Sequence, residues 1–143
     1  MDTIKLEFEG YWREINKSGV PAKSGIYCVY RATYNQSAGT VSLKELIYIG
    51  ESENAKDRIQ GHEKEREWKK HLKYGEILCF SFAPISDRFR AEAALIYKHK
   101  PVVNTEYVSS FPFRSVNIKL SGETALLNSD FTVRDTRSLY ASY

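Results

Sequence analysis

Two short runs of β-branched and aromatic residues constrain the fold more than any other feature of the sequence. Residues 25–32 read Gly-Ile-Tyr-Cys-Val-Tyr-Arg-Ala, and residues 44–50 read Lys-Glu-Leu-Ile-Tyr-Ile-Gly. Runs of this composition favour strands over helices. The segment between them contains Asn35-Gln36-Ser37-Ala38-Gly39, which supplies the residue types of a turn. The simplest prediction is therefore an antiparallel hairpin with a long connection.

The sequence beyond this hairpin predicts a helix, a third strand and a second helix. A possible cap at Ser52 or Asn54 precedes apolar residues at helical spacing, which indicates a first helix that frays or bends near residues 61–66. Residues 76–83 are almost entirely apolar and predict a buried strand, and a second helix should follow as far as Pro101. The expected fold class is α/β (α+β), a three-stranded antiparallel sheet flanked by helices, with a C-terminal accessory extension.

The two ends of the chain give weaker signals. Residues 1–24 mix aromatic and charged residues, and they predict an irregular lead-in with one helical turn. Near the other end, residues 116–120 and 131–133 could form a strand pair around a turn. With 143 residues and no shift in composition, we expect a single domain, 1–143. Its core should be 25–104, followed by an accessory tail, 105–143.

Composition excludes several classes of protein. The hydrophobic fraction of 42% suffices for a core without disulfides or a structural metal. Cys28 and Cys79 both lie in apolar runs, which predicts buried thiols in a reducing compartment, and no zinc-ligand spacing exists. No apolar run approaches the roughly 18 residues that span a bilayer, and no leader peptide is evident, so a cytoplasmic protein without membrane contact is expected. A net charge of +3 means that nucleic-acid contacts must come from local clusters of Lys and Arg.

Four side chains could carry chemistry on an anionic substrate. Strand alternation lets Tyr27 and Tyr48, at adjacent strand ends, point the same way, although single tyrosines in strands are usually packing residues. Arg58 and His62 lie four residues apart, and on a helix they would share one face beside the apolar stripe. A guanidinium can clamp a phosphate and an imidazole can donate a proton, but a solvated helix face also explains this pair.

Glu92 is the sharper signal. It falls within the apolar stripe of the second predicted helix, which includes Phe89, Ala93 and Ile96. Desolvating a lone carboxylate costs several kcal/mol unless it is paired or binds a metal ion. A metal or catalytic site and a buried ion pair, for example with Arg58, are both consistent with this position.

Taken together and in order, these residues resemble the GIY-YIG nuclease family. The match covers residues 25–104 and leaves the tail unmatched. One tripeptide would be a weak signal, whereas six ordered elements on the expected strands and helices are specific. The matching elements are Gly25-Ile26-Tyr27, Tyr48-Ile49-Gly50, Arg58 ten residues after Tyr48, His62, Glu92, and Asn104 twelve residues after Glu92.

The resemblance implies an endonuclease that hydrolyses DNA phosphodiester bonds with one divalent metal ion. In the family pattern, Glu92 would ligate Mg²⁺ or Mn²⁺, Arg58 would hold the scissile phosphate, and Asn104 would brace the site. Double-strand cleavage by such a site would require a homodimer or two sequential nicks. A restriction, mobile-element or repair enzyme would each fit.

The resemblance also implies roles for the two tripeptides. Tyr27, Tyr48 and His62 would handle the attacking water, while Gly25 and Gly50 would let the backbone pass close to the tyrosines and the substrate. A tyrosine with a pKa of about 10 is a poor base at pH 7. A nearby cation must therefore lower that pKa, or the phenol must relay its proton to His62. Our hypothesis is that Tyr27 is the base and that Tyr48 positions the water.

Two departures from the family pattern keep an alternative open. Glu51 follows the second tripeptide where many relatives carry Lys or Gln, and the connection at residues 33–43 is longer than in compact members. The alternative is a catalytically weak or inactive nucleic-acid-binding module, and a purely structural interaction domain ranks last. Basic residues that could follow a phosphate backbone are Lys56, Lys64, Lys69, Lys70, Lys73 and Arg88, with Arg114 and Lys119 in the tail.

Overall fold

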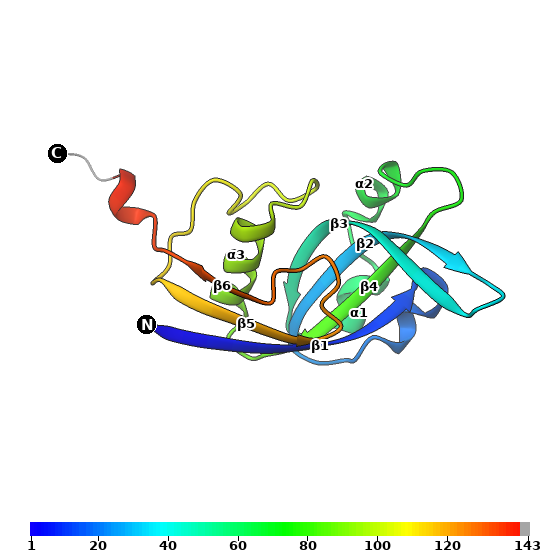
Figure 1. The fold of residues 1–143 in the computed structure, drawn as a ribbon, viewed down its shortest axis with the longest axis horizontal. Helices are drawn as coiled ribbons and strands as arrows, with labels where there is room; N and C mark the ends of the chain where they lie inside the picture. The colour runs from blue at the N-terminus through cyan, green and yellow to red at the C-terminus, as the bar shows by residue number, and fades with distance from the viewer. Residues whose placement is uncertain (141–143) are drawn as a thin grey trace.

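The computed structural model describes residues 1–140 of the chain. Six strands and three α-helices follow one another with two short 3₁₀ segments (Figure 1). In chain order these elements are β1 (Asp2–Arg13), η1 (Glu14–Gly19), β2 (Gly25–Asn35), β3 (Thr40–Ser52), α1 (Ala55–Gln60), α2 (Glu65–Lys70), β4 (Ile77–Pro84), α3 (Arg88–His99), β5 (Val116–Gly122), β6 (Asp130–Val133) and η2 (Arg137–Tyr140).

All six strands belong to one mixed sheet with the order β3-β2-β4-β1-β5-β6. Strand β2 pairs antiparallel with β3 and with β4, β1 pairs antiparallel with β4 and parallel with β5, and β5 pairs antiparallel with β6. The sheet curves into a half-barrel (Figure 1). The predicted three-stranded antiparallel sheet flanked by helices is therefore wrong. The hairpin and the third predicted strand are adjacent, but they make up only half of the sheet, and helices are few.

Strand β1 accounts for much of this difference. Residues 2–13 form a strand where an irregular lead-in was predicted, and only η1 corresponds to the expected helical turn. Ile4, Leu6 and Phe8 are buried and alternate with exposed residues such as Lys5. This alternation is typical of a strand with one solvated face. Residues 2–8 of β1 pair with β5, and residues 9–13 pair with β4.

The predicted strand pair near the C-terminus is confirmed by β5 and β6, which pair antiparallel. Strand β5 does more than the sequence indicated, because it also pairs with β1 over seven residue pairs, from Asp2 opposite Val116 to Phe8 opposite Gly122. This segment therefore completes the main sheet. No helix within residues 1–140 is long and apolar enough to cross a membrane.

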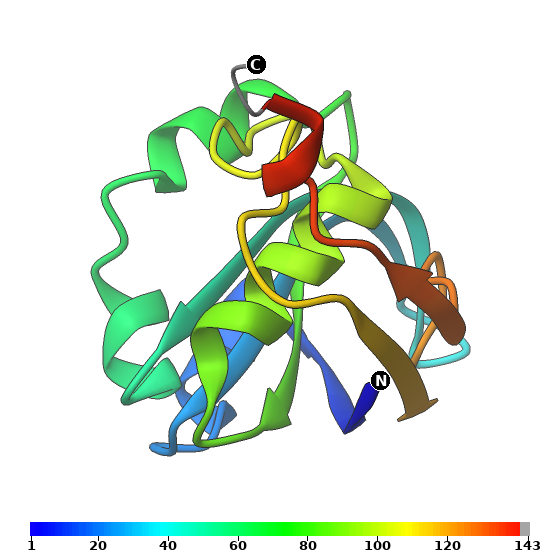
Figure 2. The ribbon, with the colours of Figure 1, turned by 90° about the vertical axis from the view of Figure 1, so that its left-hand side faces the viewer.

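Helices cover both faces of the sheet near β2 (Figure 2). Alternation along β2 directs Cys28 and Tyr30 into the core under α3, and Tyr27 and Val29 into a second core under η1, α1 and α2. Both thiols, Cys28 and Cys79, are free and buried, as predicted. Strand β3 lies next to β2 and forms one edge of the sheet.

Candidate active site

The structure brings Tyr27, Tyr48 and His62 into direct contact at the edge strand β3. The hydroxyl oxygen of Tyr27 lies 2.7 Å from His62 Nε2. The Tyr48 ring centroid lies 5.4 Å from that of His62 and 6.3 Å from that of Tyr27. Helix α1 ends at Gln60, so His62 stands in the connection to α2 and not, as predicted, on the same helix as Arg58. The two phenols nevertheless face a common imidazole.

The hydrogen bonds of His62 determine its tautomer. The backbone N–H of Lys64 donates to His62 Nδ1 at 2.9 Å, so the ring proton resides on Nε2 and is donated to the Tyr27 oxygen. Burial, followed by the charge of Arg58, lowers the pKa of His62 to about 4. The imidazole is therefore neutral near pH 7 and acts as a donor to Tyr27. A relay of the Tyr27 proton to His62 does not fit this arrangement.

Trp68 supports the imidazole and was not predicted as part of the site. Its ring is fully buried, and its centroid lies 4.4 Å from that of His62 and 5.4 Å from that of Tyr48. Its indole Nε1 has no hydrogen-bond partner within residues 1–140. The sequence contains one signal for this role, a single large aromatic residue within the charged run at residues 64–70, but that pattern alone indicates only a packing residue.

Gly50 and Gly25 stand where side chains do not fit. A Cβ atom on Gly50 would lie 2.3 Å from both the Cζ and the hydroxyl oxygen of Tyr27. A Cβ atom on Gly25 would lie 2.2 Å from the carbonyl oxygen of Ala83 and 2.6 Å from Cε1 of Phe82. Gly50 thus makes room for the Tyr27 phenol, as expected, whereas Gly25 makes room for strand β4 and only indirectly for the site.

Asn104 completes the open edge of β3. Its Oδ1 accepts the backbone N–H of Ile49 at 3.0 Å, and its Nδ2 donates to the carbonyl of the same residue at 2.9 Å. The backbone N–H of Val103 donates to the carbonyl of Ile47 at 3.0 Å. The side-chain amide therefore pairs with β3 much as a neighbouring strand would. The two β3 residues that take part in these hydrogen bonds, Ile47 and Ile49, flank Tyr48. This geometry agrees with the bracing role expected for Asn104.

Glu92 projects from α3 into a cavity of about 220 Å³ beside this edge. Burial, and then the charges of Glu51 and Glu106, raise the pKa of its carboxyl group to about 7. No cationic side chain pairs with it in the part of the chain that the structure describes, so the predicted alternative of an ion pair with Arg58 is wrong. The cavity is lined by Tyr48, Lys64, Glu92, Ile96, Val103, Asn104, Thr105 and Glu106.

Arg58 pairs with Glu63 instead. Its two terminal nitrogens, Nη1 and Nη2, each donate to one carboxylate oxygen of Glu63 at 2.6 Å. This contact lowers the pKa of Glu63 to about 2, although its side chain is 66% exposed. The charge of Arg58 also acts on the two phenols, because it opposes the rise in pKa that burial and Glu92 cause at Tyr27 and Tyr48. These groups therefore share one electrostatic environment.

Glu51, the departure from the family pattern, is neutralised by a neighbour. Arg88 Nε donates to its carboxylate at 2.6 Å, and Arg88 Nη1 donates to Ser24 Oγ at 2.9 Å. Ser24 Oγ in turn donates to the carbonyl of Ile85 at 2.8 Å, which ties the start of β2 to the segment before α3. Arg88 is thus a structural partner of Glu51 rather than an open contact for a phosphate backbone.

The donor set fits a metal ion that is shared with a substrate. Residues 1–140 contain no group of three His, Cys, Asp or Glu side chains placed to hold an ion by themselves. Magnesium commonly takes one or two protein carboxylates and completes its shell with water and substrate phosphate oxygens. Glu92, a carboxylate in a cavity without a cationic partner, satisfies that requirement.

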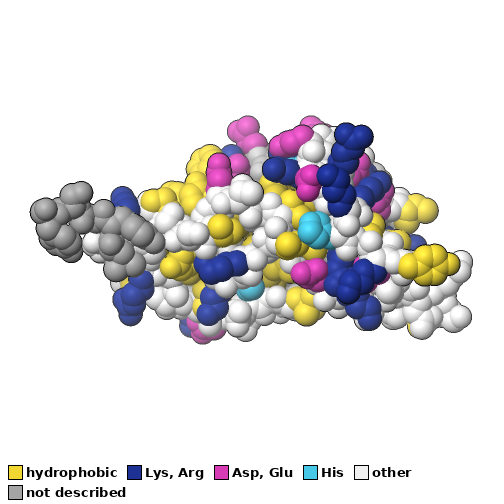
Figure 3. All heavy atoms as spheres, turned by 90° about the horizontal axis from the view of Figure 1, so that it is seen from above, with side chains coloured by type: hydrophobic (Ala, Val, Ile, Leu, Met, Phe, Trp, Pro, Cys, Tyr) yellow, Lys and Arg dark blue, Asp and Glu magenta, His cyan; other side chains and the backbone are white. Residues whose placement is uncertain are grey.

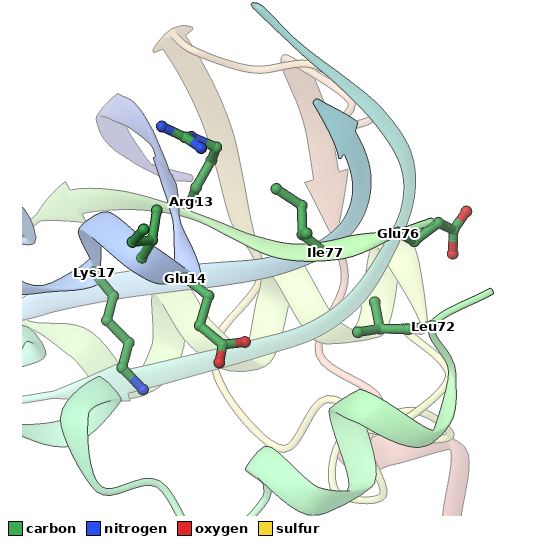
Figure 4. Close-up of a pocket in the computed structure, with 7 residues that line it drawn as sticks. Arg13, Glu14, Lys17, Leu72, Glu76 and Ile77 are labelled. Carbon is green, nitrogen blue, oxygen red and sulfur yellow. The ribbon is translucent and has the colours of Figure 1, made fainter. Parts of the chain in front are cut away.

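The surface around the site carries charges of both signs. Figure 3 shows Lys and Arg side chains next to Asp and Glu side chains over the part of the molecule that holds α2. A larger cavity, of about 530 Å³, contains none of the predicted site residues, and its Glu14, Lys17 and Glu76 side chains all have ion-pair partners. It is lined by Arg13, Glu14, Ile15, Lys17, Leu72, Glu76 and Ile77 (Figure 4).

Comparisons of the chain with family models, with curated proteins and with solved structures find no significant match. Function is therefore inferred from the geometry of the site and from the motif resemblance.

Proposed function

We propose that this protein is a divalent-metal-dependent nuclease with a GIY-YIG-like site that hydrolyses phosphodiester bonds in DNA. The observation that carries the proposal is Glu92, a carboxylate without a cationic partner in a cavity beside Tyr48. The neighbouring groups are two phenols, Tyr27 and Tyr48, which His62 contacts, and the guanidinium of Arg58, and such groups can position a water and offset charge on a phosphate. No cationic side chain in residues 1–140 pairs with Glu92, and besides a hydrogen bond from the backbone of Glu51 its carboxyl group faces the cavity.

Glu92 would hold the Mg²⁺ or Mn²⁺ ion. When bound, such a cation offsets the negative charge that develops on the phosphate and on the departing oxygen. Because the pKa of Glu92 is raised to about 7, a proton competes with the cation for the carboxylate near neutral pH. Cation binding should therefore strengthen as the pH rises through 7.

The two tyrosines differ in their access to a substrate. Tyr48 is half-buried and lines the cavity with Glu92, whereas Tyr27 is only 1% exposed and accepts a hydrogen bond from His62. This favours Tyr48 as the phenol that contacts the attacking water, and Tyr27 as the residue that positions His62 and packs against Gly50. The assignment reverses the roles expected from the sequence.

Activation of the water needs help from nearby positive charge. Burial raises the pKa of both tyrosines, so neither phenol ionises readily at pH 7. Arg58 acts in the opposite direction at both rings, and a cation on Glu92 would do the same. We therefore propose that deprotonation is coupled to cation binding, with cleavage faster at alkaline than at neutral pH.

Arg58 would hold a phosphate after exchanging its partner. Its contact with the exposed carboxylate of Glu63 has the same two-pronged geometry as a guanidinium–phosphate contact. Exposed ion pairs contribute about 0–1 kcal/mol, so the exchange costs little. Two observations favour the second candidate, a catalytically weak nucleic-acid-binding module. The tyrosines resist ionisation, and Arg58 already has a carboxylate partner.

The deciding experiment compares cleavage by wild type and by Glu92→Gln on supercoiled plasmid and branched DNA, with Mg²⁺, Mn²⁺ or EDTA. Glu53→Gln, the same chemical change at an exposed position, is the matched control. We expect metal-dependent nicking by wild type and by the control, and a loss of about 100-fold or more in the variant. Equal cutting by Glu92→Gln, or no cutting by wild type, would refute the nuclease proposal. DNA binding without cutting would support the second candidate.

A further inference from the structure

Lys64 contacts the candidate site through its backbone and lines the cavity beside it. Its N–H fixes the tautomer of His62 through the hydrogen bond to Nδ1 at 2.9 Å. Lys64 is half-buried and is one of the residues that line the cavity with Tyr48 and Glu92. Lys64 is the only cationic residue among those that line this cavity. Two carboxyl groups, those of Glu92 and Glu106, belong to the same lining.

Several neighbouring cations are already engaged. Arg58 pairs with Glu63, Arg88 pairs with Glu51, and Lys69 and Lys70, further along α2, pair with Glu14 and Glu67. Over residues 1–140, Lys64 forms no ion pair. An ammonium group without an ion-pair partner is available to an anion brought into the cavity that Lys64 lines.

We propose that the Lys64 ammonium group binds a backbone phosphate of the nucleic-acid substrate at this cavity. The inference rests on the proposed function and names a substrate-binding residue for it. A phosphate that approaches Glu92 also meets the negative charge of Glu106, and Arg58 offers no open donor pair until Glu63 leaves. Lys64 supplies the compensating positive charge from the outset. A lysine suits this task because its flexible stem needs no fixed geometry.

The test measures binding of a fluorescent DNA duplex by anisotropy in EDTA, where no cutting occurs, over a series of salt concentrations. The proteins are wild type, Lys64→Gln, Lys64→Arg and the control Lys44→Gln. Lys44 is exposed on β3, has no ion pair within residues 1–140 and lies outside the cavities described above. All four retain the backbone N–H at residue 64, so the hydrogen bond to His62 is available in each.

We expect Lys64→Gln to weaken binding about 5- to 10-fold near 0.1 M salt and to lower the slope of log affinity against log salt by about 1. Lys64→Arg should bind within about 2-fold of wild type because the charge is kept, and so should Lys44→Gln. In cleavage assays, Lys64→Gln should raise KM more than it lowers kcat.

The outcomes separate this inference from the proposed function. Wild-type affinity and slope in Lys64→Gln, or an equal loss in Lys44→Gln, would overturn the role of Lys64 even if the protein cuts DNA. Binding that depends on Lys64, in a protein that never cuts, would support this role and refute the nuclease. Absence of any DNA binding by wild type would overturn both.

Discussion

Replacing Glu92 by Gln should stabilise the metal-free protein at alkaline pH. Burial and the charges of Glu51 and Glu106 raise the pKa of this carboxyl group from 4.5 to about 7 in the folded state. Because the folded-state pKa is above the unfolded one, the native state binds more protons between about pH 4.5 and pH 7. The contribution of Glu92 to stability therefore falls as the pH rises through this window.

The size of the effect follows from the same two pKa values. The difference between 4.5 and about 7 corresponds to a penalty of about 3 kcal/mol at pH 8, at about 1.4 kcal/mol for each factor of ten in proton affinity. Glu92 is half-buried, and solvent screening reduces the expected penalty to about 1–3 kcal/mol. The neutral amide avoids this penalty, so the melting temperature should rise by about 4–12 °C at pH 8.

Urea unfolding at pH 4, 6 and 8 would measure the gain in stability. The proteins compared are metal-free wild type, Glu92→Gln and the control Glu53→Gln. The gain in Glu92→Gln should be near zero at pH 4 and largest at pH 8, and absent from the control at every pH. Added Mg²⁺ at pH 8 should stabilise wild type but not Glu92→Gln, since only wild type keeps the carboxylate. A gain that is equal at pH 4 and pH 8, or a loss of stability at pH 8, would refute the reasoning.

Three further predictions concern the neighbours of Glu92. Gly50→Ala places a methyl group 2.3 Å from the Tyr27 hydroxyl oxygen, so we expect urea unfolding to show a loss of about 1–3 kcal/mol, with cleavage lost too; unchanged stability would contradict the steric argument. Glu63→Gln frees Arg58 and removes a negative charge, so DNA binding measured by anisotropy should tighten several-fold, and weaker binding would count against Arg58 as a phosphate ligand. The pKa of His62 is lowered from 6.5 to about 4, so its contribution to stability is lost as the pH falls through that window. His62→Gln should therefore lose less stability than wild type in urea titrations between pH 6.5 and 4, and equal losses would refute the burial of a neutral imidazole.

Much of the local structure around the site could be predicted from the sequence. The hairpin, the buried third strand and the second long helix are present as β2, β3, β4 and α3. Tyr27 and Cys28 lie on opposite faces of β2, as the alternation of side chains along any strand requires. These features depend on short-range periodicity, which hydrophobic spacing records directly. Ile4, Leu6 and Phe8 also alternate with polar residues, which is typical of a strand. The charged and aromatic residues elsewhere in 1–24 favoured an irregular segment instead.

The length of the first predicted helix was harder to judge. The spacing of Ala55, Ile59 and His62 favoured a helix that reaches His62 and frays near residues 61–66, and α1 ends at Gln60 with Gly61 as its C-cap. Glycine is among the poorest helix formers, and the His62 ring accepts the backbone N–H of Lys64 instead of continuing the helix. A side chain that satisfies a backbone donor in this way competes with helical hydrogen bonding.

The sequence alone determined which residues have the chemistry for a phosphodiester site and on which local elements most of them lie. Only the tertiary structure decided the sheet order, because β1 pairs with β5 across more than a hundred residues and a strand carries no local record of its partner. The tertiary structure also decided which charged side chains pair. Arg58 pairs with Glu63 and Arg88 pairs with Glu51. Glu92 and Lys64 line one cavity and have no ion-pair partner in residues 1–140, and these outcomes depend on distances in three dimensions. Ionic interactions fall off within a few ångströms in a solvated protein, so spacing along the chain does not predict them.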